Sequence, residues 1–341
     1  MDANKIPNFG IIGAGLVAQA YAGAFRESKF ARVVAVTDVR PEAAADMAEG
    51  LGCRSFADYK EMAEQCQLDA VVVCTPPVTH FEICMYFLDR GVHVLCEKPL
   101  SIEPRSAKLM LDNARERGVI LTMASKFRFV QDVIRAKSLL SSGIIGDVVL
   151  MENVFTSRVD MSQRWTSVPE LSGGGVLIDN GTHSVDIMRY FLGPLTEIYA
   201  IEGKRLQSPR VEDTVQIKAR SASGAIASST LSWSINTERE NFIEIYGTRG
   251  EIMIGWQRSK YRTLSAPKWI EFGTGYKKIA AFLGQLESFT KAITFEQPSP
   301  TTSEDALASV LCVAAGYTAV QENRWVTIPT TVEARSNSIA A

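Results

Sequence analysis

Short apolar runs separated by helical stretches fill the first third of the chain. Five runs have the length of buried strands, at residues 8–12, 31–36, 68–74, 92–96 and 119–123. Helix start and stop signals lie between them, such as Pro41 before an alanine-rich stretch and Gly91 directly after Arg90. Strands that alternate with helices predict right-handed βαβ units around a parallel sheet.

Beyond about residue 125 the pattern changes. A helical stretch at 127–140 is followed by runs that are mostly strand-like, and few helices separate the last four. These runs, at residues 148–156, 196–201, 214–219, 225–232, 241–246 and 251–256, predict a largely antiparallel sheet with one covered face. Two helices, 276–295 and 303–321, close the chain. The first domain is therefore predicted to be α/β and the second α+β.

The first strand ends in a glycine turn that opens a helix. Gly13 and Gly15 interrupt the apolar run, and Ala18 follows three residues later. Strand, turn and helix are the context that a G-x-G-x-x-A pattern needs for dinucleotide binding. Gly13 permits a tight turn, Gly15 lets a pyrophosphate approach the backbone, and Ala18 lets the helix pack closely. The helix N-terminus, at Leu16 and Val17, offers free N–H groups to the phosphates.

Asp38 closes the second strand about 20 residues beyond the glycines. An acid at this place accepts hydrogen bonds from an adenosine ribose and repels a 2′-phosphate, which favours NAD over NADP. Arg40 leaves NADP open as the less favoured cofactor, since it could hold a 2′-phosphate if Asp38 turned away. A βα turn without a ligand is the alternative for the bare glycine pattern.

Composition and charge narrow the class of protein. The 341 residues suggest two domains, and the net charge of −2 gives no broad basic field for nucleic acid. No run approaches the roughly 18 apolar residues of a membrane span, and the start of the chain lacks the apolar core of a signal peptide. The six cysteines show no C-x-x-C pair and no zinc spacing. We expect a cytoplasmic enzyme with neither nucleic-acid nor membrane partners.

Two segments carry residues suited to acid–base chemistry. Glu97-Lys98-Pro99 follows the fourth strand at the edge where parallel sheets bind ligands, although a surface lysine before a turn would look the same. Downstream, Gly173-Gly174-Gly175 precedes a helix on which Asp179 and His183 share a face, with Asp186 three residues further. A histidine can take an alcohol proton at neutral pH. A hydrogen-bonded core histidine and a metal ligand are the alternatives, but no third ligand is evident and we expect no metal.

Together these segments resemble the Gfo/Idh/MocA oxidoreductases, which include glucose–fructose oxidoreductase and myo-inositol dehydrogenase. The resemblance rests on Gly13 to Ala18, Asp38, Thr75-Pro76, Glu97-Lys98-Pro99 and the run from Gly174 to Asp186, and it covers the chain from Phe9 to about Trp325. It implies a Rossmann domain at 1–125 and an α+β domain with a large, mostly antiparallel open sheet at 126–335. In the family that sheet commonly forms the interface of a homodimer or homotetramer.

The resemblance also implies roles for individual residues. Lys98 falls on the family's active-site lysine, His183 on its acid/base and Asp179 on an aspartate that contacts the substrate. The Lys98–Pro99 bond is often cis in relatives. Phe282 stands where many relatives have tyrosine, so a hydroxyl contact is expected to be missing. Further cofactor contacts are expected from Thr75, Pro76, Pro77, His80, Glu97 and Arg128, and further substrate contacts from Arg128, Arg164 and Trp165.

The activity implied is reversible hydride transfer between a secondary hydroxyl of a sugar, sugar derivative or cyclitol and the nicotinamide. His183 would act as the acid/base, and Lys98 would stabilise charge on the substrate oxygen. Two alternatives stay open: an NAD-dependent enzyme that cleaves a glycosidic bond through transient oxidation, and a non-catalytic cofactor-binding regulator. The loops 157–171 and 257–276 are expected to decide which substrate binds.

Overall fold

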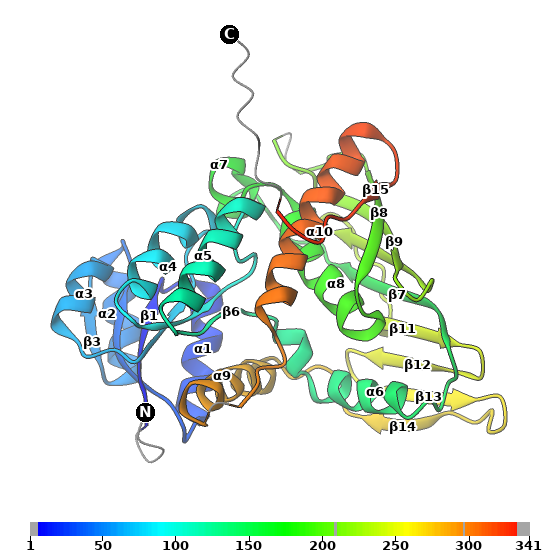
Figure 1. Cartoon of the computed structure of the whole chain (residues 1–341), viewed down its shortest axis with the longest axis horizontal. Coiled ribbons are helices and arrows are strands. Elements are labelled where there is room, and N and C mark those ends of the chain that lie inside the picture. Colours follow the sequence, from blue (N-terminus) through cyan, green and yellow to red (C-terminus); the bar gives the residue numbers. More distant parts are fainter. Residues whose placement is uncertain (1–5, 208–209, 296, 333–341) are drawn as a thin grey trace, which may run out of the picture.

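The computed structural model describes residues 6–207, 210–295 and 297–332, which fold around two β-sheets. Figure 1 shows the N-terminal sheet and the C-terminal sheet side by side, with helices from the end of the chain between them. The predicted domain limits, 1–125 and 126–335, stay predictions, and their outermost residues lie outside the described ones.

The N-terminal sheet has the parallel topology that alternating strands and helices predict. Its strands are β1 (Asn8–Ile12), β2 (Arg32–Thr37), β3 (Arg54–Phe56), β4 (Ala70–Val73), β5 (His93–Cys96) and β6 (Leu121–Met123). They are ordered β3-β2-β1-β4-β5-β6, and every neighbouring pair is parallel. The order reverses between β1 and β4, which opens a crevice at the carboxyl ends of the strands.

The connecting helices follow the start signals in the sequence. They are α1 (Leu16–Glu27), α2 (Pro41–Leu51), α3 (Tyr59–Gln65), η1 (Pro77–Thr79), α4 (His80–Leu88) and α5 (Pro104–Glu116). The five strands predicted here are present, and β3 is an addition at the sheet edge. Two of its three residues are exposed, so it forms no apolar run that the sequence could reveal.

The C-terminal sheet is mostly antiparallel, as predicted. Its strands are β7 (Val148–Thr156), β8 (Leu195–Glu202), β9 (Thr214–Ser221), β10 (Ile226–Ser232), β11 (Asn241–Gly247), β12 (Gly250–Gly255), β13 (Ser259–Thr263), β14 (Ile270–Gly273) and β15 (Val326–Thr327). They are ordered β14-β13-β12-β11-β7-β10-β9-β8-β15, and among the described strands only β7 and β10 run parallel.

The segment 257–276 is not the substrate loop that the sequence predicted. It contains β13 and β14, which extend the edge of the C-terminal sheet, and none of its residues lines the cavity described below. Most side chains of the two strands are partly or fully exposed, so their hydrophobic alternation is too weak to mark them as strands.

Helices cover one face of the C-terminal sheet and return to the N-terminal one. The remaining helices are η2 (Lys126–Phe129), α6 (Gln131–Ser141), η3 (Trp165–Ser167), α7 (Pro169–Ser172), α8 (Val176–Leu192), α9 (Lys278–Phe295) and α10 (Ser303–Glu322). α8 packs on β9 and β10, while α10 contacts both α8 and α5. α9 packs along α1 (Figure 1). The ring centre of Phe289 on α9 lies 6.1 Å from that of Phe9 on β1. The last helices therefore tie the two sheets together around the crevice.

Candidate functional site

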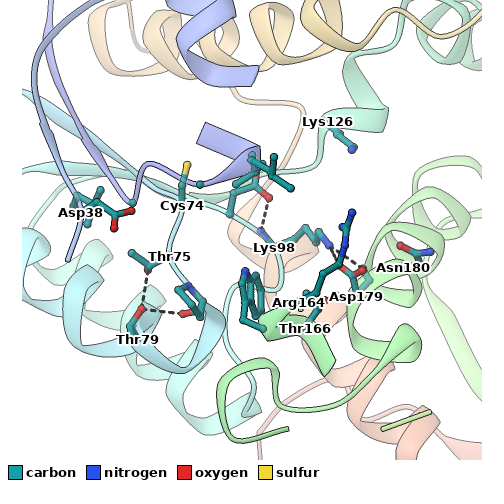
Figure 2. A pocket seen from close by; sticks show the side chains of 18 of the residues that line it. Asp38, Cys74, Thr75, Thr79, Lys98, Lys126, Arg164, Thr166, Asp179 and Asn180 are labelled. Carbon is teal, nitrogen blue, oxygen red and sulfur yellow. Dashed lines mark hydrogen bonds and ion pairs between the residues drawn. The ribbon is translucent and has the colours of Figure 1, made fainter. Parts of the chain in front are cut away.

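A cavity of about 1270 Å³ lies at the crevice between the two sheets. Its walls come from the β1–α1 turn, the ends of β2, β4 and β5, the segment η2, the loop 156–166, and helices α8 and α9. Figure 2 shows how side chains from these elements face one another across this space. The carboxyl edge of the parallel sheet therefore forms one wall, and the C-terminal half of the chain forms the other.

The glycine turn at one end of the cavity fits a pyrophosphate. Gly13 has a φ of +91°, and a Cβ there would lie 3.0 Å from the backbone of Cys74, so the tight turn requires glycine. A Cβ on Gly15 would meet nothing within 4 Å, because this residue faces the open cavity. No side chain caps α1, which begins at Leu16, so its first N–H groups are free for an anion. Ala18 is fully buried in the core below the turn.

Asp38 lies at the end of β2, beside the same turn. Its carboxylate accepts hydrogen bonds from the Ala14 N–H at 2.7 Å and from the Arg40 Nε at 3.0 Å. Burial alone would raise the pKa of Asp38, but these hydrogen bonds hold that pKa below its ordinary value. The group is therefore an ionised acceptor next to the place that the turn offers to a dinucleotide.

The buried side chain of His80 supports the segment that follows β4. Both ring nitrogens of this buried histidine lie 2.9 Å from backbone oxygens, one of Thr75 and one of Pro99. Thr75 and Pro76 line the cavity, but Pro77 and His80 do not. The structure therefore gives His80 a supporting place rather than the cofactor contact that the sequence suggested.

Lys98 enters the cavity from the end of β5. Its ammonium pairs with the Asp179 carboxylate and also donates to the Asp179 backbone oxygen at 3.1 Å (Figure 2). The Lys98–Pro99 peptide is cis, as the resemblance led us to expect. This pair joins the two walls of the cavity, because Asp179 lies in the first turn of α8.

Glu97 lies beneath Lys98 and is held by a tyrosine that the sequence did not single out. The Tyr21 hydroxyl donates to the Glu97 carboxylate at 2.9 Å and accepts from Gln285 at 2.7 Å. Burial raises the pKa of Glu97, and the nearby charges of Lys98 and Lys126 act against that rise. Phe282 has no hydroxyl, and the buried hydroxyl that contacts Glu97 comes from Tyr21 on α1, whose ring packs against Phe282.

His183 presents an almost buried ring to the cavity, with 8% of the residue exposed. Its ring packs edge-on against Phe127, with ring centres 5.1 Å apart. Burial lowers the pKa of His183 well below its ordinary value, and the charges of Lys98 and Lys126 lower it further. The imidazole is therefore neutral at pH 7 and able to accept a proton.

The two carboxylates expected to flank His183 form ion pairs with other side chains. Asp179 shares its helix face but pairs with Lys98, and Asp186 pairs with Arg128 at 2.8 Å. Among the described residues no hydrogen bond to the His183 ring is found. The aromatic packing and the helix α8, rather than a carboxylate, hold this imidazole in place.

The start of α8 is held by a buried carboxylate. Glu212 accepts hydrogen bonds from the N–H groups of Gly175 and Leu177, both at 3.0 Å, and from the Tyr317 hydroxyl at 2.8 Å. A Cβ on Gly175 would lie 2.0 Å from the Glu212 backbone oxygen, so this close approach requires glycine. The third glycine of the run thereby fixes the helix that carries Asp179 and His183.

Arg128 does not reach the cavity, contrary to the cofactor and substrate contacts expected from the sequence. Its guanidinium is 3% exposed and pairs with Asp186 and Asp305, both at 2.8 Å, and it donates to the Pro300 backbone oxygen at 2.7 Å. All its nitrogens thus face the junction of η2, α8 and the start of α10. Three partners that lie far away in the sequence hold it there.

Lys126 is a cavity residue that the sequence reasoning missed. It lies three residues after the end of β6, in η2, and its side chain extends toward the cavity in Figure 2. Burial lowers the pKa of Lys126 to about 8, and the charge of Lys98 adds to this shift. A search of the first three residues after each parallel strand, at the edge where such sheets bind ligands, would have included Lys126.

The loop 157–171, expected from the sequence to decide which substrate binds, lines the cavity through residues between 157 and 166. Arg164 and Trp165 both line it, and Trp165 keeps 42% of its surface exposed. Trp233 and Trp256 line the same cavity from the C-terminal sheet side. Indole rings beside charged groups suit a ligand that has both an apolar face and hydroxyls.

Neither a metal cluster nor a membrane span is found in the part of the chain that the structure describes. No three His, Cys, Asp or Glu side chains there come together as metal ligands. None of the described helices combines the length and the apolar character needed to cross a bilayer.

Both halves of the chain match models of known protein families. The family model described as "Oxidoreductase family, NAD-binding Rossmann fold" matches residues 7–125, and "GFO/IDH/MocA C-terminal domain" matches residues 133–253. The myo-inositol 2-dehydrogenase of Thermotoga maritima is 26% identical over 333 residues, covering 93% of this chain and 97% of the relative. The inositol 2-dehydrogenase of Rhizobium meliloti is 27% identical over 343 residues, covering 94% and 98%.

A solved structure has the same fold over nearly the whole chain. Levoglucosan dehydrogenase in complex with NADH and levoglucosan superposes with a TM-score of 0.87 at 22% identity, covering 95% of this chain and 99% of that one. The fold therefore agrees with the family matches in both domains. Because the two family models together account for most of the chain between residues 7 and 253, this protein belongs to the Gfo/Idh/MocA family of NAD-binding oxidoreductases.

Proposed function

We propose that this protein transfers hydride reversibly between a secondary hydroxyl of a sugar, sugar derivative or cyclitol and the nicotinamide of NAD. The observation that carries the proposal is the convergence of Lys98, Asp179 and the neutral His183 in one cavity. That cavity also contains the glycine turn and Asp38. The names of the inositol and levoglucosan dehydrogenases that resemble the chain support this substrate class.

The residues present would hold NAD along the carboxyl edge of the N-terminal sheet. Gly13, Gly15 and the first turn of α1 would bind the pyrophosphate, and Asp38 would accept hydrogen bonds from the adenosine ribose. The bound cofactor supplies the carbon that accepts or returns the hydride.

Residues of the chain would transfer the hydroxyl proton and stabilise the charge on the substrate oxygen. His183, neutral at pH 7, accepts the hydroxyl proton during oxidation and returns it during reduction. Lys98 donates a hydrogen bond to the same oxygen and stabilises the negative charge that develops on it. Asp179 holds the Lys98 ammonium in place. The Phe127 ring and the loop 157–171 limit the access of water.

The experiment that tests this function is NADH formation at 340 nm with a panel of free sugars, inositols, sugar acids and glycosides. NAD and NADP are compared in parallel, and reduction of the matching ketoses is measured in the reverse direction. Turnover with one class in either direction supports the proposal. No hydride transfer with any class, from protein shown to bind NAD, would contradict it.

Replacing Asp38 by alanine should weaken NAD binding and reduce the preference of NAD over NADP. The variant removes the acceptor beside the turn and leaves the Arg40 guanidinium, now without its partner, available to a 2′-phosphate. Each cofactor's Kd is measured by fluorescence titration. Asp112→Ala, which removes an acid paired on the surface of α5, serves as the control and should change neither value. An unaltered NAD-to-NADP ratio in Asp38→Ala would show that Asp38 does not contact the ribose.

We also propose that the outer face of the C-terminal sheet forms a homodimer or homotetramer. Tyr246, Leu150 and Ile226 are neighbours in register across β11, β7 and β10, on the face away from α8. Ion pairs between Arg220 and Glu197 and between Arg262 and Glu251 flank this apolar row. An apolar centre with a charged rim is typical of protein interfaces.

Introducing a charge into this row should separate the subunits. Ile226→Glu is expected to shift the sedimenting mass from a multiple of 37.4 kDa to the mass of one chain. Leu109→Glu, at an exposed leucine on α5, is the matched control and should keep the assembly. A native protein that sediments as one chain would contradict the proposal.

A further inference from the structure

The Lys126 ammonium lies in the cavity near the Glu97 and Asp179 carboxylates but forms an ion pair with neither of them. Among the described residues no ion pair or hydrogen bond to its side chain is found. Its amino group lies 5.2 Å from the centre of the Phe127 ring and 5.6 Å from that of Phe282. These rings hold the side chain in place but leave its three donors to whatever occupies the cavity.

The charges that face Lys126 do not neutralise it. Lys98 and Asp179 form an ion pair with each other. The buried Glu97 carboxyl accepts hydrogen bonds from the Tyr21 hydroxyl and from the Lys98 backbone N–H. Lys278, at the start of α9, adds another positive charge at the cavity wall. The end of the cavity beside His183 therefore carries more positive than negative charge.

The other titratable groups around Lys126 are neutral. Burial lowers the pKa of His183 and raises the pKa of Tyr276 to about 12, so neither carries charge at pH 7. Burial and Lys98 lower the pKa of Lys126 itself to about 8, so most molecules still carry the ammonium at pH 7. A substrate that fills the cavity thus meets an unpaired cation.

We propose that Lys126 binds a carboxylate of the substrate, so that the enzyme acts on acidic sugars such as uronates and aldonates. The inference rests on the proposed hydride transfer and specifies its substrate class. A neutral sugar would displace water from the ammonium and leave its charge without a partner. A carboxylate would add the attraction of its opposite charge to the hydrogen bond with the ammonium, which a sugar hydroxyl cannot do.

A site of this kind discriminates between acidic and neutral sugars, because a neutral sugar leaves the Lys126 ammonium without an ion-pair partner. A cavity built to pair a charged group rejects the analogue that lacks the partner, because the buried group then stays unsatisfied. Lys98 keeps its own role, since its ammonium is already fixed by Asp179 near the oxygen that reacts. Lys126 would orient the substrate from the opposite end, so that one hydroxyl faces both Lys98 and His183.

The test compares matched neutral and acidic sugars. The kcat/KM for D-glucuronate over D-glucose, and for D-galacturonate over D-galactose, should be on the order of tenfold or more in the native enzyme. Lys126→Met should reduce this ratio to about 1, while Lys126→Arg should restore most of it. Lys277→Met, which removes an exposed lysine beside α9 that does not line the cavity, should leave the ratio unaltered.

The ratio should also depend on pH in a defined direction. The positive charge is present below a pKa of about 8 and disappears as the pH rises through that value. The preference for the uronate should therefore decrease between pH 7 and pH 9 in the native enzyme. It should stay nearly constant in Lys126→Arg, because a guanidinium keeps its charge across this range.

A binding measurement separates this inference from the proposed function. Uronate and neutral sugar are titrated into the NAD-loaded enzyme, and the fluorescence of the cavity tryptophans reports binding without turnover. Tighter uronate binding that is lost in Lys126→Met supports the inference even if no hydride is transferred. Equal binding of both sugars, or a Lys126→Met variant that weakens NAD itself and not the uronate, would overturn it.

Discussion

Replacing His183 by alanine should reduce the turnover of sugar oxidation by about 10²–10⁴-fold, the usual contribution of a positioned base. The structure offers this ring to the cavity in its neutral form, which is the form that accepts a proton. NAD affinity should be unchanged, because the glycine turn and Asp38 lie at the other end of the cavity. Turnover is followed at 340 nm and NAD affinity by fluorescence titration.

A second histidine provides the matched control. His93 lies at the start of β5, at the opposite end of the strand from Lys98, where its Nδ1 accepts a hydrogen bond from the Ile120 N–H. His93→Gln should therefore change turnover by less than a factor of about two, well below the effect expected for a catalytic base. Native turnover in His183→Ala, or an equal loss in both variants, would exclude His183 as the base.

The pH profile of the native enzyme should agree with this assignment. The pKa of His183 is depressed by burial first and by Lys98 and Lys126 next, so the neutral base persists below its ordinary titration range. The rate of oxidation should be flat through pH 6.5 and decrease only at more acidic pH. A decrease centred at pH 6.5 or above would mean that the base is more exposed than this ring.

In the proposed mechanism, the Lys98 ammonium that lowers the pKa of His183 would also favour the reaction. A positive field lowers the pKa of the imidazolium and of the substrate hydroxyl together, so the proton transfer between them stays balanced. Lys98, fixed by Asp179, would provide this field at the reacting oxygen. His183 thus lacks the flanking carboxylate expected from the sequence, and under the proposed function a cation would act on the substrate oxygen instead.

The parts of the site that obey local rules could be predicted from the sequence. Gly13 is dictated by the backbone of a tight strand–helix turn, Gly15 follows from the room that a ligand needs beside that turn, and Lys98 follows from the end of a buried strand. The apolar runs of the parallel strands gave their positions within two residues, because both faces of that sheet are buried. Short edge strands such as β13 lack this signal, since their side chains are largely half-exposed.

The parts that depend on distant contacts could not be predicted. The partner of Asp179 is 81 residues away, and the Tyr21 hydroxyl contacts Gln285 across 264 residues. The resemblance to the family implied that Arg128 contacts the cofactor and the substrate. Only the fold shows that carboxylates from α8 and α10 meet its guanidinium, with nothing left to face the cavity.

This arrangement gives Arg128 the largest expected effect on stability. Its side chain and that of Asp186 are each 3% exposed, and the guanidinium donates hydrogen bonds of 2.8–3.1 Å to the Asp186 carboxylate. Removing one member of a buried pair leaves an uncompensated charge, which costs about 3–5 kcal/mol of folding free energy. We therefore expect Arg128→Met to lower the free energy of unfolding, measured by urea titration and circular dichroism, by this amount.

An exposed ion pair of the same chemistry is the control. Arg117 contacts Asp89 at 3.0 Å on the surface, with 53% and 44% of the side chains exposed, and such pairs contribute at most about 1 kcal/mol. Arg117→Met should therefore be nearly neutral. If Arg128→Met were equally neutral, the buried pair would not stabilise the junction of η2, α8 and α10.

Two further measurements separate an uncompensated charge from lost packing. Burial raises the pKa of Asp186 and Arg128 opposes that rise, so in Arg128→Met the folded-state pKa of this acid should rise further. A raised folded-state pKa means that stability is lost as pH rises, so the deficit should be smaller at pH 5 than at pH 8. The double variant Arg128→Met, Asp186→Leu should regain a large part of the loss, because no buried acid is left unpaired. If the double variant were as unstable as Arg128→Met, and the loss did not depend on pH, the loss would be due to packing around η2. The position of η2, which carries Lys126, would then depend on the volume of the Arg128 side chain rather than on its charge.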